Sequence, residues 1–448
     1  MAIAVIALAA CQPSQPSSVP DMLVDSRPVQ AVPTPAVVAR VDRNLGDLLA
    51  AITESAAHGL NPADYQPERL RALAGTAAGT LLTREMALRL ARDLAHGRVS
   101  AGRVDSAWHI RDSDPDPTSA VDAALHAQTL AMTLAGLAPA AAEYQLLTTE
   151  MRSLGAGNAI VSADPARQRR LESLRATLER WRWLPRTLPA HRLWVNLPEY
   201  RLFLWRGGAA VRAHDVIIGK VAHPTPSFRV DVTGVVFNPW WDPPRRLVSE
   251  SVIPALRRGQ GARLDYRLYR DGLPVPLTTL GWKSLSSLPS GYRLRQAPGP
   301  SNALGQVKLR MYNTYDIYLH DTPNKELFDQ PKRALSNGCI RTRDALGLAR
   351  ALVAGTAGWD AARVATALET RRETTVGLGQ PLPAFLVYMT AVVRDGAVIT
   401  LDDVYGRDAG VVAALDTPRD ARADLDAPVA ATAATGAADD DGASRCAV

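Results

Sequence analysis

The chain has 448 residues, 47% of them hydrophobic and 21% charged, which is an ordinary balance for a globular protein with a sizeable core. The length indicates roughly three domains. The net charge is +6, and arginines crowd residues 167–186, where Glu172 and Glu179 are interleaved at helical spacing. This pattern indicates a solvated helix face, and because no nucleic-acid-binding module accompanies it, we expect no nucleic-acid partner.

The N-terminus resembles a lipoprotein signal. Residues 1–10 are apolar and lead into Leu-Ala-Ala-Cys at 8–11, the pattern of a bacterial lipobox whose cysteine becomes lipidated. No lysine or arginine precedes Arg27, whereas a secretory signal normally begins with positive charge, so a short apolar tail is the alternative. The first interpretation places the protein in the periplasm or cell envelope of a bacterium, with a lipid anchor on Cys11. Residues 12–38 are rich in proline and serine and are expected to form a linker without fixed structure.

A helical region follows the linker. From about residue 41 to 154 the sequence is alanine-rich with helical periodicity, interrupted at 59–62 and 112–117 by turn-forming residues. This pattern predicts a helical scaffold. His58 and His96 lie within it, and we expect both to be structural.

From about residue 191 the periodicity becomes that of strands, which predicts a mainly-β domain. The predicted strands are 192–197, 201–205, 211–219, 228–237 and 315–320. A segment from about 243 to 299 interrupts them, with a helical pattern at 245–258 followed by turns. An insertion of this length is either a lid or an inert excursion, and both interpretations stay open. A further helix is predicted at 344–354.

Cys339 is the strongest candidate for a catalytic residue. The other two cysteines, Cys11 and Cys446, lie in terminal segments with little to bury. A thiol attacks as the thiolate, which needs an imidazole or a helix N-terminus nearby, and the pattern provides both in His320 and the helix that follows. Gly338 permits a tight turn in which backbone N–H groups near 338 and 339 form an oxyanion hole. A buried apolar cysteine beside a structural histidine is the alternative.

At these residues the chain resembles the YkuD-type L,D-transpeptidases. The signature of that family is a histidine followed by a Ser-His-Gly-Cys-(Ile/Val)-Arg run, and this chain has His320 followed by Ser-Asn-Gly-Cys-Ile-Arg at 336–341. The resemblance covers roughly residues 40–408. It is specific for the large, YcbB-like branch through Arg-Trp-Arg-Trp-Leu-Pro at 180–185 and Gln-Ala-Pro-Gly-Pro at 296–300.

The resemblance implies an α+β fold, with a helical scaffold domain, a mainly-β YkuD-type catalytic domain and an inserted capping subdomain. The implied division is a lipoprotein-like signal at 1–11, a linker at 12–38, the scaffold domain at 39–186, the catalytic domain at 187–358 with the capping insertion at 245–299, a C-terminal segment packing on the scaffold at 359–408, and a disordered tail at 409–448. A peptidoglycan-binding module that many relatives insert after the scaffold is expected to be absent.

The resemblance also implies the chemistry. Cys339 forms a thioester with a peptidoglycan stem tetrapeptide and releases D-Ala, His320 is the general base, and the side-chain amine of a second stem takes the acyl group. The other implied residues are Gly338, Asn337 and the backbone carbonyl of Asp321 in oxyanion and supporting roles, and Arg341, Ser336 and Thr322 in substrate binding. Donor and acceptor stem peptides are the implied partners, carbapenems the implied covalent inhibitors, and no cofactor or metal is expected.

One residue departs from the family signature. Asn337 stands where the family usually has histidine, and because asparagine carries no charge, activation of the thiol is expected to come from His320 and the helix end.

Other chemistries fit the sequence less well. A penicillin-binding D,D-transpeptidase needs Ser-x-x-Lys, and none of the five lysines has a serine three positions before it. The eight histidines are scattered and give no zinc-peptidase ligand cluster. Two alternatives stay open: an L,D-carboxypeptidase, in which water takes the acyl group, and a catalytically weak peptidoglycan-binding protein.

Overall fold

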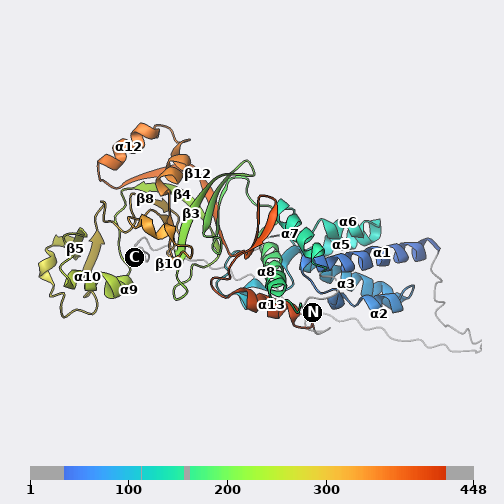
Figure 1. Cartoon of the computed structure of the whole chain (residues 1–448). Coiled ribbons are helices and arrows are strands. Elements are labelled where there is room, and N and C mark those ends of the chain that lie inside the picture. Colours follow the sequence, from blue (N-terminus) through green and yellow to red (C-terminus); the bar gives the residue numbers. More distant parts are fainter. Residues whose placement is uncertain (1–34, 112–113, 156–161, 420–448) are drawn as a thin grey trace, which may run out of the picture.

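The computed structural model describes residues 35–111, 114–155 and 162–419. The expected α+β fold is confirmed: Figure 1 shows a helical region at one end, a barrel of strands in the middle, and a smaller region of strands and short helices at the other end. The lipobox with Cys11, most of the linker, and Cys446 lie outside the described residues.

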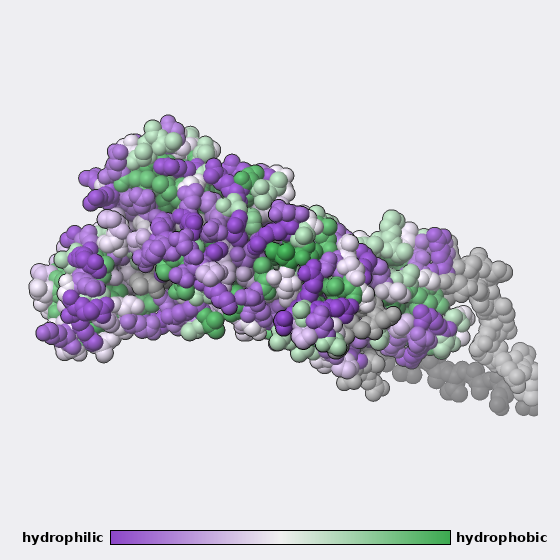
Figure 2. All heavy atoms as spheres, viewed as in Figure 1, coloured by the Kyte–Doolittle hydropathy of each residue, from purple (hydrophilic) through white to green (hydrophobic). Residues whose placement is uncertain are grey.

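No helix in the described part of the chain is both long enough and apolar enough to cross a bilayer. On the face drawn in Figure 2, hydrophilic residues predominate and hydrophobic residues form small, separate groups.

The helical region is built around α3 (Ala77–His96). Its first turn is capped by the side chain of Thr76, and the helix ends at Gly97, whose φ is 89°. Leu82, Met86 and Leu90 recur at four-residue spacing and are all buried, so one face of the helix packs into the core. The other elements of this region are α1 (Pro35–Glu54), η1 (Ser55–His58), η2 (Pro62–Tyr65), α2 (Pro67–Ala72), α4 (Ala101–Val104), α5 (Thr118–Ala127), α6 (Leu130–Ala135) and α7 (Ala142–Ser153).

The arginine-rich helix α8 (Pro165–Arg182) is largely buried from Leu171 onward, so the expectation of a solvated helix face was wrong for this part. Arg180 and Arg182 are both fully buried, and each has a carboxylate partner. Arg180 pairs with Asp408 at 2.5 Å, and Arg182 pairs with Glu179 one turn earlier. Charge spacing along one helix cannot reveal this burial, because Asp408 comes from the distant C-terminal part of the chain.

A closed barrel carries the motif residues. Its strand order is β3-β11-β9-β8-β4-β12-β1-β2, and β2 pairs with β3 to close it, while β10 joins β3 from outside. Two pairings are parallel within the ring, β1 with β12 and β9 with β11. The strands are β1 (Arg192–Asn196), β2 (Arg201–Arg206), β3 (Ala209–Gly219), β4 (Phe228–Phe237), β8 (Val307–Arg310), β9 (Leu319–His320), β10 (Ala334–Ser336), β11 (Ile340–Thr342) and β12 (Thr374–Val387). The four strands predicted between 192 and 237 are confirmed.

The strand predicted at 315–320 is much shorter than expected, since only β9 at its end is extended and paired. The carboxamide oxygen of Asn313 accepts hydrogen bonds from the N–H groups of Tyr315 (3.1 Å) and Ile317 (3.2 Å). Asp316 between them has a φ of 54°. An asparagine that bonds the backbone ahead of it favours a turn, which here replaces the first part of the strand.

The insertion at 245–299 is more ordered than the predicted turns. After α9 (Arg245–Leu247), the π-helical turn η3 (Val248–Val252) and α10 (Ile253–Arg257), a separate three-stranded sheet forms from β5 (Tyr266–Arg270), β6 (Leu273–Val275) and β7 (Tyr292–Gln296). Asp271 and Gly272 link β5 to β6, both with positive φ. An Asp-Gly pair is a strong hairpin signal, so this part of the sheet was readable from the sequence.

The C-terminal part of the chain corrects two expected boundaries. Residues 359–408 were expected to pack on the scaffold, but β12 is a central barrel strand paired with β1 and β4. The hairpin of β13 (Ala391–Arg394) and β14 (Ala397–Thr400) instead contacts α7 and α8. The tail was expected to be disordered from 409, yet α13 (Asp408–Asp416) is a helix that buries Val411 and Leu415, an i, i+4 apolar pair.

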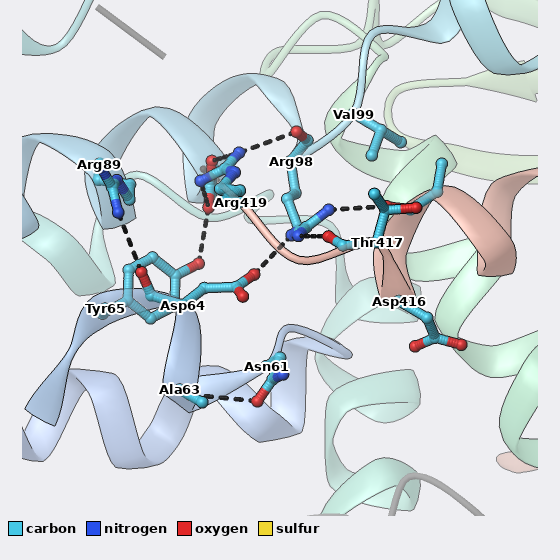
Figure 3. Close-up of polar contacts among 12 residues, drawn as sticks. Asn61, Ala63, Asp64, Tyr65, Arg89, Arg98, Val99, Asp416, Thr417 and Arg419 are labelled. Atoms are coloured by element: carbon cyan, nitrogen blue, oxygen red, sulfur yellow. Dashed lines mark hydrogen bonds and ion pairs between the residues drawn. The ribbon is translucent and has the colours of Figure 1, made fainter. Parts of the chain in front are cut away.

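Buried polar contacts join the end of α13 to the scaffold (Figure 3). Arg419 donates to both carboxylate oxygens of Asp93, each at 2.8 Å. Arg98 pairs with Asp64 at 2.6 Å and donates to the Thr417 carbonyl at 2.6 Å. The C-terminal segment is therefore held against the helical region by largely buried ion pairs and hydrogen bonds.

Candidate active site

Cys339 lies in a tight turn between β10 and β11. The residue is buried, with 1% of its surface exposed, and it is the one cysteine within the described ranges. Gly338 before it has a φ of 123°, a conformation that residues with a Cβ rarely adopt. The glycine expected from the motif is therefore needed for the turn that presents the thiol.

Pairing of β9 with β11 places His320 near this turn. The parallel register puts Arg341 opposite His320 and Ile340 opposite Leu319, so Cys339, the residue before Ile340, follows a turn that ends beside the strand carrying His320. The shortened strand β9 retains the two residues that this pairing requires.

The hydrogen bonds of His320 assign its protons. Nδ1 donates to the backbone carbonyl of Asp321 at 2.5 Å, and a carbonyl oxygen can only accept. Nε2 is buried and has no hydrogen-bond partner. In the neutral ring the proton therefore sits on Nδ1, and Nε2 carries the lone pair.

The surroundings of His320 keep the ring neutral. Burial, and after it the positive charge of Arg341, lowers the pKa of His320 to about 3, against a smaller raising effect of the Asp321 carbonyl. At neutral pH the site therefore holds a buried, uncharged base.

Ser336 is built into the Cys339 turn. Its hydroxyl accepts a hydrogen bond from the Gly338 N–H at 3.1 Å and donates to the Cys339 carbonyl at 2.6 Å. Asn337, between them, is half-buried. The Gly338 N–H that was expected to serve the oxyanion hole is thus engaged with Ser336 in this structure.

The helix after the motif does not reach Cys339, which corrects the expectation that its N-terminus activates the thiol. The extended strand β11 separates Cys339 from α11 (Ala345–Val353), a span of roughly 10 Å at the rise of a strand. Asp344 already caps the helix, since its carboxylate accepts a hydrogen bond from the Gly347 N–H at 2.8 Å.

Arg341 and Thr322 line a pocket of about 440 Å³ beside the turn. Other residues that line it belong to the capping insertion and include Glu250, Arg258 and Tyr266. Thr322 is buried, and its hydroxyl accepts a hydrogen bond from the N–H of Asn324. The capping insertion thus shares a pocket with two of the expected substrate-binding residues.

The carboxylate of Asp321 has a structural environment of its own. It accepts a hydrogen bond from the Gln306 N–H at 2.9 Å and forms an ion pair with Lys325. The part of Asp321 that acts on His320 is therefore the backbone carbonyl, and the side chain braces the segment that carries it.

Lys308 is a site residue that the sequence analysis did not select. It lies opposite His320 in the pairing of β8 with β9, and its ammonium group is 4.4 Å from the centre of the Tyr318 ring. Burial lowers the pKa of Lys308, and its charge contributes to the lowered pKa of His320. The alternating pattern of residues 307–310 indicates a strand, but no local pattern shows that this strand lies beside β9.

A second pocket, also of about 440 Å³, lies where the helical region meets the barrel. His109 lies on its helical side and stacks on Tyr315 at a ring distance of 4.7 Å. The next residue, Asp316, accepts a contact from Cys339 Sγ at 3.6 Å through its backbone carbonyl. Across the described ranges, no group of His, Cys, Asp and Glu residues is arranged to hold a metal ion.

Comparisons with known proteins match two parts of the chain to domain families. Residues 190–365 match the family model of the L,D-transpeptidase catalytic domain, YkuD, and residues 37–151 match the model of the scaffold domain. A curated "Putative L,D-transpeptidase" from Haemophilus influenzae (strain ATCC 51907 / DSM 11121 / KW20 / Rd) is 36% identical over 219 residues. That match covers 48% of this chain and 44% of the relative, so the chain spans less than half the relative's length.

Two solved structures also show similarity. The Ldtfm–avibactam carbamoyl enzyme is 13% identical, with 45% of this chain and 49% of that chain covered and a TM-score of 0.20. An L,D-transpeptidase from Mycobacterium smegmatis is 14% identical, with 44% of this chain and 58% of that chain covered and a TM-score of 0.22.

Proposed function

We propose that this chain, whose residues 190–365 match the L,D-transpeptidase catalytic domain and whose residues 37–151 match the scaffold domain, cross-links peptidoglycan stem peptides through a thioester on Cys339. The observation that carries this proposal is the buried Nε2 of His320, a neutral lone pair on the strand next to the thiol. A buried nitrogen without a hydrogen-bond partner is costly, and such groups concentrate at functional sites.

The first half-reaction acylates Cys339. His320 Nε2 takes the thiol proton, and Sγ attacks the carbonyl that joins the third residue of a stem tetrapeptide to its terminal D-Ala. A sulfur–carbon bond forms, the carbon–nitrogen bond breaks, and D-Ala leaves with the proton that His320 returns to its amine. Because the Asp321 carbonyl holds Nδ1, the ring keeps the tautomer that this proton transfer needs.

The second half-reaction transfers the acyl group. The side-chain amine of the third residue of another stem attacks the thioester, a carbon–nitrogen bond forms, and the carbon–sulfur bond breaks. The amine loses a proton to His320, which passes it to the thiolate. The product is a cross-link between the third residues of two stems, and the protein works in the cell envelope, where peptidoglycan is found.

The oxyanion that forms in both steps needs backbone donors in the 338–339 turn. We assign the main contribution to the N–H of Cys339, because the oxygen of a carbonyl attacked by Sγ lies close to that residue's own backbone. A contribution from the Gly338 N–H would require it to exchange its bond with Ser336.

The pocket under the capping insertion is the proposed place for the donor stem. Arg341 supplies a guanidinium that pairs with a substrate carboxylate, and Thr322 supplies a hydroxyl at the same end of the cavity. Carbapenems are expected to acylate Cys339 by the same attack, because a β-lactam carbonyl presents the same chemistry to the thiol.

Mass spectrometry of purified tetrapeptide muropeptides incubated with the protein and with Cys339→Ala tests the proposal. Dimers joined through their third residues, formed only when Cys339 is present, are the expected result. Tripeptide without dimers would replace the transpeptidase with an L,D-carboxypeptidase. Unchanged substrate with folded protein would contradict catalysis and favour a peptidoglycan-binding role.

A further inference from the structure

The loop between β3 and β4 lies directly against the Cys339 turn. The N–H of Lys220 donates to the Ser336 carbonyl at 2.8 Å. At Gly219, a Cβ atom would lie 3.1 Å from the Cα of Gly338 and 2.2 Å from the His223 carbonyl oxygen. The loop and the turn therefore pack backbone against backbone, which only a glycine at 219 allows.

The side chain of Thr225 in this loop hydrogen-bonds the Cys339 turn. It is fully buried, and its hydroxyl oxygen accepts from the Gly219 N–H at 2.9 Å. The same hydroxyl donates to the Gly338 carbonyl at 2.7 Å. Because an N–H can only donate and a carbonyl can only accept, the direction of both bonds is determined.

This bond orients a peptide group that matters for catalysis. The Gly338 carbonyl and the Cys339 N–H belong to the same planar trans peptide unit, so they point in opposite directions. Holding the carbonyl on Thr225 therefore aims the Cys339 N–H away from Thr225. A hydrogen bond to the carbonyl also polarises the N–H of the same unit and makes it a better donor.

The C-terminal segment holds Thr225 in place. The Tyr405 hydroxyl donates to the Gly219 carbonyl at 2.6 Å and accepts from the Thr225 N–H at 3.3 Å. Arg407 donates to the Thr225 carbonyl at 3.1 Å, and its guanidinium lies 4.8 Å from the centre of the Tyr405 ring. Asp105 of the helical region is 4.0 Å from Arg407. Tyr405 and Arg407 lie beyond residues 190–365, the stretch that matches the catalytic-domain model.

We propose that Thr225 is a positioning residue for acyl transfer, which aims the Cys339 N–H at the oxyanion, and that Tyr405 and Arg407 fasten it there. This inference rests on the proposed function, since it assigns the Cys339 N–H as the oxyanion donor. It gives the segment after the barrel a role at the nucleophile that its distance in sequence does not suggest.

The test compares Thr225→Val, which removes the hydroxyl at nearly constant volume, with Thr225→Ser, which keeps it. Two reactions of Cys339 are followed by mass spectrometry: acylation by a carbapenem, which passes through an oxyanion, and alkylation by iodoacetamide, which displaces iodide at a saturated carbon and forms none. Loss of a whole oxyanion donor costs about 10²- to 10³-fold, so we expect misorientation to slow acylation roughly 10- to 100-fold in Thr225→Val. Alkylation should stay within about twofold, and Thr225→Ser should restore acylation.

Acylation of Thr225→Val at the rate of the unmodified protein would overturn the inference, as would an equal loss of acylation and alkylation. If Thr225→Val does not fold, Tyr405→Phe provides the same comparison of acylation with alkylation, with a smaller expected loss of acylation. An unchanged acylation rate in Tyr405→Phe would also overturn the inference. If the unmodified protein alkylates but is not acylated at all, the proposed function fails rather than the role of Thr225.

Discussion

His58 of the helical region and His320 of the barrel differ in how their ring nitrogens are used. Burial lowers the pKa of both His58 and His320 to about 3. Nδ1 of His58 bonds the Tyr144 hydroxyl at 2.8 Å, and Arg182 bonds the same hydroxyl at 3.1 Å. His320 has one nitrogen on a backbone carbonyl and leaves Nε2 with no partner.

Both histidines have a lowered pKa, so a lowered pKa alone does not identify a catalytic group. His58 belongs to a polar network that joins η1 to α7 and α8, so its ring serves to hold helices together. The unused lone pair of His320, beside a thiol, is what marks that residue as a base.

The largest effect is expected from replacing each histidine by glutamine, because the two replacements should change different properties of the protein. His320→Gln removes the proposed base and should slow acylation of Cys339 roughly 10²- to 10⁴-fold. His58→Gln weakens one buried hydrogen-bond network and should cost about 1–2 kcal/mol of unfolding free energy, with the acylation rate of the folded protein unchanged. Mass spectrometry of acylation and urea unfolding measure the two effects. A rate loss in His58→Gln without loss of folding would refute the structural assignment.

Breaking a buried ion pair of the helical region should have the next largest effect, and on stability alone. Arg98→Met leaves Asp64 buried without its partner and frees the Thr417 carbonyl, so we expect a loss of roughly 3–5 kcal/mol in unfolding free energy. The matched control is Arg84→Met, because Arg84 pairs with Asp122 at the surface and should cost at most about 1 kcal/mol. Equal losses of unfolding free energy in the two variants would show that the buried ion pair contributes no more to stability than the surface pair.

Removing the charge of Arg341 should sharpen the account of His320. After burial, the positive charge of Arg341 is the next largest cause of the lowered pKa of His320, because a nearby cation disfavours the protonated ring. Arg341→Gln should therefore raise that pKa, so that the ring begins to take up a proton at a higher pH than in the unmodified protein. Ring NMR signals, assigned with His320→Gln, measure the midpoint. Arg343→Gln, at a half-exposed position nearby, is the control, and an unmoved midpoint in Arg341→Gln would contradict the assignment.

The smallest expected effect concerns the helix that follows the motif. Asp344 caps α11 and Asp360 caps α12 (Ala361–Glu369) through equivalent hydrogen bonds of 2.8 Å. Replacing either by alanine should cost about 1 kcal/mol of unfolding free energy. Because β11 separates α11 from the thiol, iodoacetamide should alkylate Cys339 at the same rate in Asp344→Ala as in Asp360→Ala. A change in the alkylation rate of Asp344→Ala alone would show that the N-terminus of α11 does influence the thiol.

Much of the site could be predicted from local sequence, because its motif is local. Ser336 to Arg341 form one turn and the start of one strand, and Gly338 is demanded by the backbone conformation of that turn. The strands between 192 and 237 followed from alternation along each segment. The strand at 315–320 was mispredicted because the turn built by Asn313 overrides that alternation.

Local patterns in the sequence were sufficient to divide the chain into helical and strand regions, to indicate the family that it resembles, and to select Cys339 and His320 as candidates. Three features are visible only in the folded structure: Arg175, Arg180 and Arg182 of α8 are buried, Lys308 lies opposite His320, and Thr225 holds the Gly338 carbonyl. The physical reason is the range of the interactions. Periodicity and turn preference act between neighbours in the chain, whereas burial, the tautomer of a histidine and the partner of a hydroxyl depend on segments that meet only when the chain has folded.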